Sequence, residues 1–150
     1  MASQSPPGAV ILARIEVQKG SLANALELVD RAAVLYGSEG VPDGFHLLRG
    51  DILARMNRLP EAEAEMREEI RLHPRAVAPR ISLALVLASQ GRMAEARRTV
   101  VETAENNPRL DAFVKGAAAL DYFGDRAGAA ALRRRGHALF PNDPRLKSGT

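Results

Sequence analysis

A period of 33 to 34 residues runs through this chain, and it limits the possible folds more than any other feature. Pro74 and Pro108 lie 34 residues apart, and Pro141 follows 33 residues later. Small residues precede each proline in the same order: Asn57 and Ala62, then Gly91 and Ala96, then Gly124 and Ala129. Gly20 and Ala25 begin a fainter copy upstream. A fixed period of this length indicates stacked supersecondary units, each of which buries its apolar face only against a neighbour.

The composition favours helices over strands. Apolar residues make up 46% of the 150 residues, but aromatic residues only 4%, so the core must consist mainly of Ala, Leu, Val and Ile. Chains rich in Ala and Leu form closely packed helices more readily than sheets. The chain contains no Cys, which excludes disulfides, thiolate zinc sites and a Cys nucleophile.

The charge is basic but modest. The formal net charge is +3, and Arg supplies 18 of the 21 basic residues. This charge alone does not indicate a nucleic-acid partner. The bias towards Arg and Ala is typical of a high-GC bacterial coding sequence. Residues 1–8 lack a basic leader region, and no apolar run reaches the roughly 18 residues of a membrane span. We therefore expect no membrane span and a cytoplasmic location, unless the chain belongs to an exported parent.

The period predicts a repeat domain over residues 6–143, with a flexible N-terminus at 1–5 and a flexible tail at 144–150. Its units cover about 6–42, 43–76, 77–109 and 110–143, and each reads as two helices. The third unit shows this best, with helices predicted at 78–90 and 93–105. A longer connection rich in Gly and Pro at residues 37–43 predicts the weakest joint of the stack.

Three kinds of residue give each unit its predicted hairpin. The turn between the helices falls at Gly20, Asn57, Gly91 and Gly124, where a left-handed residue ends the first helix at little cost. Small residues recur where the two helices of a unit must cross: Ala13, Gly50, Ala84 and Ala117 on the first, Ala25, Ala62, Ala96 and Ala129 on the second. The prolines end the second helix.

This combination of period, turn glycines, paired small residues and terminal prolines resembles the tetratricopeptide repeat (TPR) family over about residues 6–141. The resemblance implies an all-α, right-handed superhelical solenoid of about four helix-turn-helix repeats. An ordinary all-α bundle with chance spacing is the alternative.

The resemblance also implies that the first helix of each unit lines a concave groove. The fifth and ninth residues of each unit (places five and nine), which lie on that helix, and residues near its end then become the candidate partner-binding residues: Val10, Arg14, Leu47, Asp51, Arg55, Ile81, Leu85, Ser89, Val114, Ala118 and Tyr122. Their spacing of three and four residues places them on one helical face. Place five is apolar in all four units, so the alternative is that it belongs to the core. Since the groove offers no inward Asn, an acidic chaperone-tail ligand is disfavoured.

Two charged clusters stand outside this groove. Five glutamates, at Glu61, Glu63, Glu65, Glu68 and Glu69, follow one predicted second helix, and we interpret them as a solvated outer face. Arg133, Arg134 and Arg135 lie on the last helix. They suit the polar end face that a terminal repeat requires, with phosphate binding as the alternative.

No motif for catalysis, a metal or a cofactor is present, and the three histidines fall in three different units. We therefore expect a non-catalytic protein-interaction module that binds a peptide or helix of a partner in an apolar concave groove. The alternatives are a repeat region of a larger transferase or sulfatase that presents or regulates substrate, and a self-assembly module. A protein or peptide partner is expected rather than nucleic acid, with the chain itself a monomer or weak homo-oligomer.

Overall fold

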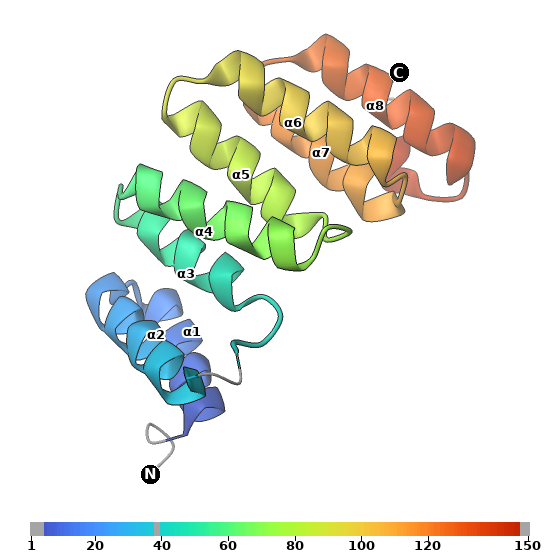
Figure 1. Cartoon of the computed structure of the whole chain (residues 1–150). Helices are drawn as coiled ribbons and strands as arrows, with labels where there is room; N and C mark the ends of the chain where they lie inside the picture. Colours follow the sequence, from blue (N-terminus) through green and yellow to red (C-terminus); the bar gives the residue numbers. More distant parts are fainter. Residues whose placement is uncertain (1–4, 38–39, 148–150) are drawn as a thin grey trace. The chain divides into compact units, whose positions relative to one another are not determined.

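The computed structural model describes residues 5–37 and 40–147. Within these residues the chain forms α-helices, with a short 3₁₀ helix after the last of them, and no strand. In chain order (Figure 1) the helices are α1 (Pro6–Lys19), α2 (Leu22–Tyr36), α3 (Phe45–Arg55), α4 (Leu59–Leu72), α5 (Ala78–Ser89), α6 (Met93–Asn106), α7 (Leu110–Tyr122), α8 (Arg126–Leu139) and the 3₁₀ helix η3 (Pro144–Leu146). The all-α fold of successive helical hairpins predicted from the sequence is confirmed.

The chain divides into two compact units, unit 1 (Met1–His73) and unit 2 (Pro74–Thr150). Unit 1 holds α1 to α4, coloured blue to green in Figure 1, and unit 2 holds α5 to η3, coloured yellow-green to red. The most extensive packing joins α1 to α2, α3 to α4, α5 to α6 and α7 to α8. Each of these pairs is one predicted hairpin, so each unit contains two consecutive repeats.

All four predicted turn residues adopt the left-handed conformation. The φ angles are 81° at Gly20, 59° at Asn57, 80° at Gly91 and 77° at Gly124. Asn57 is the only non-glycine residue with a positive φ among the described residues. Asn tolerates this region better than other side chains, which explains why it replaces glycine here.

The predicted small residues lie where the helices of each hairpin cross. Ala13, Ala25, Ala62, Ala84, Ala96, Ala117 and Ala129 are all at most 1% exposed. Gly50 on α3 shows the tightest requirement, because a Cβ added there would lie 2.7 Å from the Met66 Cε and 3.3 Å from the Ala62 carbonyl oxygen of α4. A larger side chain at Gly50 would force α3 and α4 apart.

The first correction concerns the glutamates of α4. Glu69 is only 3% exposed, and its carboxylate accepts hydrogen bonds from the backbone nitrogens of Gly44 (2.8 Å) and Leu47 (3.3 Å) at the start of α3. Glu65 is also largely covered and pairs with His46 at 2.7 Å. Glu69 therefore caps the N-terminus of α3, and Glu65 binds side chains of the same helix. Because the Glu63 side chain is also only 16% exposed, only Glu61 and Glu68 fit the predicted solvated face.

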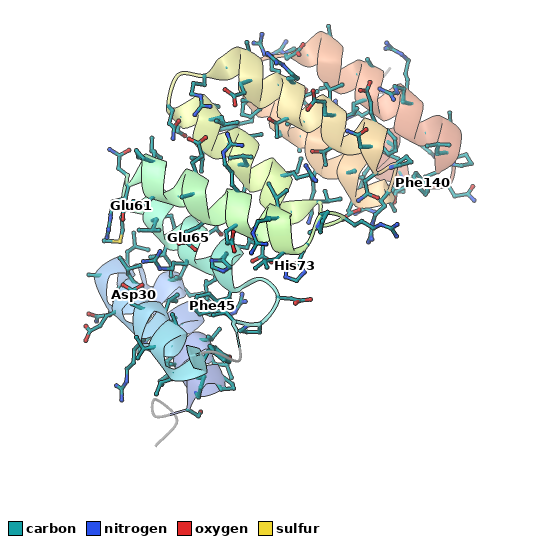
Figure 2. The ribbon with its side chains drawn as sticks, viewed as in Figure 1. Asp30, Phe45, Glu61, Glu65, His73 and Phe140 are labelled. Atoms are coloured by element: carbon teal, nitrogen blue, oxygen red, sulfur yellow. The ribbon has the colours of Figure 1, made fainter. Side chains whose placement is uncertain are left out.

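The second correction concerns the predicted weak joint at residues 37–43, of which 38 and 39 lie outside the described residues. The division between the compact units falls after His73, not here. Arg49 of α3 bridges this joint, because its guanidinium binds Asp30 of α2 at 2.8 Å and Glu65 of α4. Figure 2 labels both of these acidic residues. Side-chain pairing therefore links the two hairpins on either side of this connection.

The third correction concerns the predicted tail. Residues 144–146 form η3 and the Leu146 side chain is fully buried, so they belong to the packed part of unit 2. Leu146 packs at Gly136 of α8, where an added Cβ would lie 3.1 Å from the Leu146 Cδ1 and 2.7 Å from the Phe113 Cβ. Of the predicted N-terminal segment only Ser5 is described, and its Oγ caps α1 by accepting from the Gly8 nitrogen; residues 1–4 and 148–150 lie outside the described residues.

Candidate functional site

The candidate residues form two faces, one in each unit. We call Val10, Arg14, Leu47, Asp51 and Arg55 the A face of unit 1, and Ile81, Leu85, Ser89, Val114, Ala118 and Tyr122 the A face of unit 2. Each face lies on the first helices of consecutive hairpins, and these helices contact one another: α1 with α3, and α5 with α7. Within a unit, the structure therefore places candidates from both first helices on adjoining elements.

The A face of unit 1 is mainly charged. Arg14, Asp51 and Arg55 are exposed, whereas Val10 and Leu47 are half-buried. Partial desolvation raises the pKa of the Asp51 carboxyl above its usual value, and the nearby Arg55 guanidinium opposes this shift. A cationic group of a ligand placed near Asp51 would lower this raised pKa, because it favours the charged carboxylate.

The A face of unit 2 is mainly apolar and more accessible. Tyr122 is 79% exposed and Leu85 is 38% exposed, and both lie on this one face. Ala118 and Ser89 are also exposed, and the Ser89 Oγ donates to the Leu85 carbonyl oxygen at 3.0 Å. This face therefore offers an aromatic and an aliphatic surface on neighbouring helices.

The four residues at place five do not behave alike. Ile81 is only 9% exposed and therefore belongs mainly to the core, as the alternative interpretation of that place expected. Val10, Leu47 and Val114 are half-buried, and Val114 borders a surface hollow of about 350 Å³. In unit 2, Leu85 and Tyr122 present more apolar surface than either place-five residue.

The sequence analysis missed several accessible apolar side chains. Ile11 and Ile15 are 59% and 39% exposed on α1, and Val34 is 80% exposed on α2. The spacing of four residues between Ile11 and Ile15 puts them on one side of α1, and this signal was readable in the sequence. The hollow beside Val114, by contrast, includes Arg145 of η3, which no local pattern could have placed there.

The ionisable clusters of the described residues are structural in arrangement. Arg133 pairs with Asp121, and Arg135 with Glu105 at 3.2 Å, so two of the three consecutive arginines have carboxylate partners within unit 2. No group of three or more His, Asp or Glu side chains in the described part of the chain has an arrangement that could hold a metal ion. Among the described helices, none is long and apolar enough to cross a membrane.

These elements define an all-α protein of repeated helical hairpins. No protein-family model matches the sequence, and no curated protein matches it. Several solved structures, however, match this chain. A tetratricopeptide repeat protein from Parabacteroides merdae is 17% identical over 95% of this chain, with a TM-score of 0.71. TTC0263, a thermophilic TPR protein in Thermus thermophilus, is 19% identical over 95% of this chain, with a TM-score of 0.70.

A third similar structure is YrrB, described as a TPR protein with an unusual peptide-binding site, which is 18% identical over 96% of this chain, with a TM-score of 0.62. The match covers 73% of YrrB, 78% of TTC0263 and 56% of the Parabacteroides protein, so this chain spans little more than half the length of the last. At these identities the likeness concerns the fold. The chain has the tetratricopeptide repeat fold, as the resemblance in its sequence indicated.

Proposed function

We propose that this chain is a non-catalytic protein-interaction module that binds a peptide or helix of a partner on its A faces. The observation that carries the proposal is the exposure of Leu85 and Tyr122 on the adjoining helices α5 and α7. Side chains held on packed helices lose little conformational entropy on binding. Tyr is among the residues that are enriched at the energetic centres of protein interfaces, and Leu85 adds apolar surface beside it. The description of YrrB as having a peptide-binding site supports the same class of function.

The two A faces would contribute differently. Unit 2 would supply the apolar anchors, and Val114, Ala118 and Ser89 would shape the surface around them. Unit 1 would supply charges: Arg14 and Arg55 for acidic groups of the partner, and Asp51 for a basic one. Charges of this kind set the orientation and the association rate of a complex more than its affinity.

The absence of catalysis is part of the proposal and rests on how the ionisable groups are used. The most concentrated cluster joins His46, Arg49, Glu65 and Glu69 in unit 1, and each of these has a structural partner. A group already engaged in capping a helix or bridging two helices is poorly placed for proton transfer to a substrate. The larger-enzyme alternative remains a prediction from the sequence alone.

Self-association is a second candidate function, and one observation favours it. Ile11 and Ile15 expose apolar surface on the same side of α1, and a second copy could cover it. Light scattering of the wild type and of Ile11→Lys across a range of concentrations would test this. The candidate requires a concentration-dependent increase in mass that the variant lacks.

The main proposal is tested by selecting displayed peptides on the wild-type chain and measuring their affinity by calorimetry. We expect a Leu85→Glu/Tyr122→Ala variant to bind a selected peptide at least about tenfold more weakly, because both anchors are removed. Val34→Glu is the matched control, since it introduces the same charge at a side chain that is 80% exposed outside both faces. Equal affinity of the double variant and the wild type would refute binding at these anchors.

A further inference from the structure

Two surface hollows adjoin each other at the C-terminal end of unit 2. The first, of about 350 Å³, is lined by Arg109, Leu110, Asp111, Val114, Lys115 and Arg145. The second, of about 430 Å³, is lined by Leu110, Leu139, Phe140, Pro141, Asn142, Asp143 and Pro144. Leu110 at the start of α7 lines both, and we call the two neighbouring hollows together the terminal site. Phe140, which is labelled in Figure 2, lines the second hollow just past the end of α8.

The first hollow is cationic. Three basic side chains line it, from the start of α7 and from η3, against one carboxylate of its own lining, that of Asp111. Arg109 reaches that carboxylate only at 3.3 Å. Lys115 has no carboxylate partner among the described residues, and it is exposed. The positive charge of Lys115 is therefore available to an anion at this hollow.

The third cation is held in place by the fold. The Asp143 carboxylate binds the Arg145 guanidinium at 2.6 and 2.9 Å and also accepts from the Arg145 backbone nitrogen at 3.0 Å. This pairing lowers the pKa of Asp143 to about 2. Because Leu146 next to Arg145 is fully buried, η3 cannot swing away without exposing an apolar side chain. The Asp143 carboxylate thus orients Arg145 and offsets part of its positive charge. Arg145 can therefore help to position an anion, but it contributes less attraction than the unpaired Lys115.

The second hollow is apolar, and it opens next to the cations. Leu139 is 56% exposed on the last turn of α8, beside the half-buried Phe140 and the exposed Pro141. A side chain that entered this hollow would bury the exposed part of Leu139 and would contact Leu110. The carboxylates of Asp111 and Asp143 also line the terminal site, and they would repel a polyanion such as a nucleic-acid backbone. A ligand with one anionic group next to an apolar group therefore suits the terminal site better than a polyanion does.

We propose that the terminal site binds a short segment of a protein partner in which an acidic side chain lies next to an apolar one. The acidic group binds Lys115, with Arg109 and Arg145 at its sides, and the apolar side chain enters the hollow of Leu110, Leu139 and Phe140. Only Val114 is shared with the A face of unit 2. The terminal site would therefore exist even if Leu85 and Tyr122 bound nothing.

The test is a titration of the ¹⁵N-labelled full chain, followed by NMR, with the blocked dipeptide acetyl-glutamyl-leucine amide. We expect chemical shift changes concentrated at the amides of Leu110, Lys115, Phe140 and Arg145, with saturation in the millimolar range, to about 10 mM. The dipeptide acetyl-glutaminyl-leucine amide has the same shape without the charge. We expect it to bind at least about threefold more weakly.

Two variants separate the two halves of the site. Lys115→Glu should weaken binding of the glutamyl-leucine dipeptide about threefold to tenfold, because it reverses the unpaired charge. Leu139→Ser should weaken the same dipeptide but leave acetyl-glutamyl-glycine amide unchanged. Both side chains are exposed, so neither change disturbs the core, and the spectrum of each free variant reports whether it is folded.

Arg134→Glu is the charge-matched control, because Arg134 is exposed on α8 and lines neither hollow. It should bind as the wild type does. Three results would overturn the proposal. The first is the absence of chemical shift changes at dipeptide concentrations up to about 10 mM. The others are changes centred outside the two hollows, and an equal loss of dipeptide affinity in Arg134→Glu and Lys115→Glu. The last would indicate unspecific attraction to a basic chain. None of these results bears on the anchors Leu85 and Tyr122.

Discussion

Unit 1 and unit 2 have the same hairpin architecture, but their second hairpins are held together by different chemistry. In unit 1 the α3–α4 hairpin relies on ionised side chains: Arg49 of α3 binds Glu65 of α4, and the buried Glu69 caps α3. In unit 2 the α7–α8 hairpin and η3 rely on apolar packing, with Phe113, Leu120 and Leu146 at most 1% exposed. One period can therefore be built with either chemistry, and the two should respond differently to substitution and to pH.

The difference also bears on function. In unit 1, Arg49, Glu65 and Glu69 pair within the unit, whereas Arg14, Asp51 and Arg55 are exposed on its A face. In unit 2, the A face exposes Leu85 and Tyr122, and the terminal site exposes Lys115 and Leu139. The apolar anchors of both proposed binding surfaces therefore lie in unit 2.

The largest expected effect comes from Phe113→Ala in unit 2. Phe113 is 1% exposed and packs against Gly136 of α8, so truncation leaves a cavity that should lower the free energy of unfolding by about 3–5 kcal/mol. Chemical denaturation measures the loss. Amide hydrogen exchange should show faster opening in α7, α8 and η3, while the exchange of α1 to α4 stays near wild type.

Uniform acceleration of exchange through all the helices from α1 to α8 would contradict the comparison, because it would mean that the units do not open separately. The same experiment on Ala119→Gly is a milder control in α7. It removes only a methyl group that is 6% exposed and lowers the helix propensity, so a loss of about 1 kcal/mol is expected.

Glu69→Gln probes the ionic connection of unit 1 and should have an intermediate effect. The two carboxylate oxygens of Glu69 each accept one backbone N–H, whereas a Gln side chain has a single acceptor oxygen and no charge. One buried N–H is then left unpaired at the start of α3, and we expect a loss of about 1–3 kcal/mol. Exchange of the Gly44 and Leu47 amides should accelerate first.

Glu68→Gln is the matched control for this change. Glu68 is the neighbouring residue, but its side chain is 39% exposed and pairs with Arg71 on the helix surface. Its loss should therefore be about 0–1 kcal/mol. Comparable losses in the two variants would show that Glu69 acts only as a general negative charge on α4 and not as a cap of α3.

The sequence predicted those parts of the fold that depend on local geometry. The left-handed turn at Asn57 and the close helix crossing at Gly50 each follow from what one residue can adopt, or from the space it leaves. The burial of Glu69 was not predicted, because it depends on backbone nitrogens 22 and 25 residues away. Leu146 was assigned to a tail for a similar reason: the space it fills exists only once Gly136 and Phe113 have packed.

The candidate site was predictable to a smaller extent. Helical spacing identifies which residues share a face, but not how much of each side chain the neighbouring helices cover. Ile81 and Leu85 are four residues apart on α5, yet the first is 9% and the second 38% exposed. The terminal site needs residues of α7, α8 and η3 together, and no repeat period relates η3 to the rest.

The smallest expected effect is a local pH dependence at η3. It sharpens the comparison because it concerns an ion pair, Asp143–Arg145, in the unit whose second hairpin is otherwise held by apolar packing. The Arg145 guanidinium and backbone nitrogen hold the pKa of Asp143 at about 2, below the ordinary value of 3.8. A lowered carboxyl pKa stabilises the folded state above the unfolded pKa. That stabilisation declines as pH falls below about 4, and it is lost as pH falls through about 2.

An NMR titration of the Asp143 carboxyl carbon measures this directly. We expect a midpoint near 2 in the wild type and a midpoint shifted towards the ordinary Asp value in Arg145→Gln, which lacks the guanidinium. Because the Arg145 side chain is 60% exposed, the global stability of the variant at neutral pH should barely change. If the midpoint does not shift in Arg145→Gln, the Arg145 guanidinium does not pair with the Asp143 carboxylate, and this pair does not orient Arg145. The terminal site would then depend on Lys115 and Arg109 alone, and its predicted preference for a single acidic side chain would weaken accordingly.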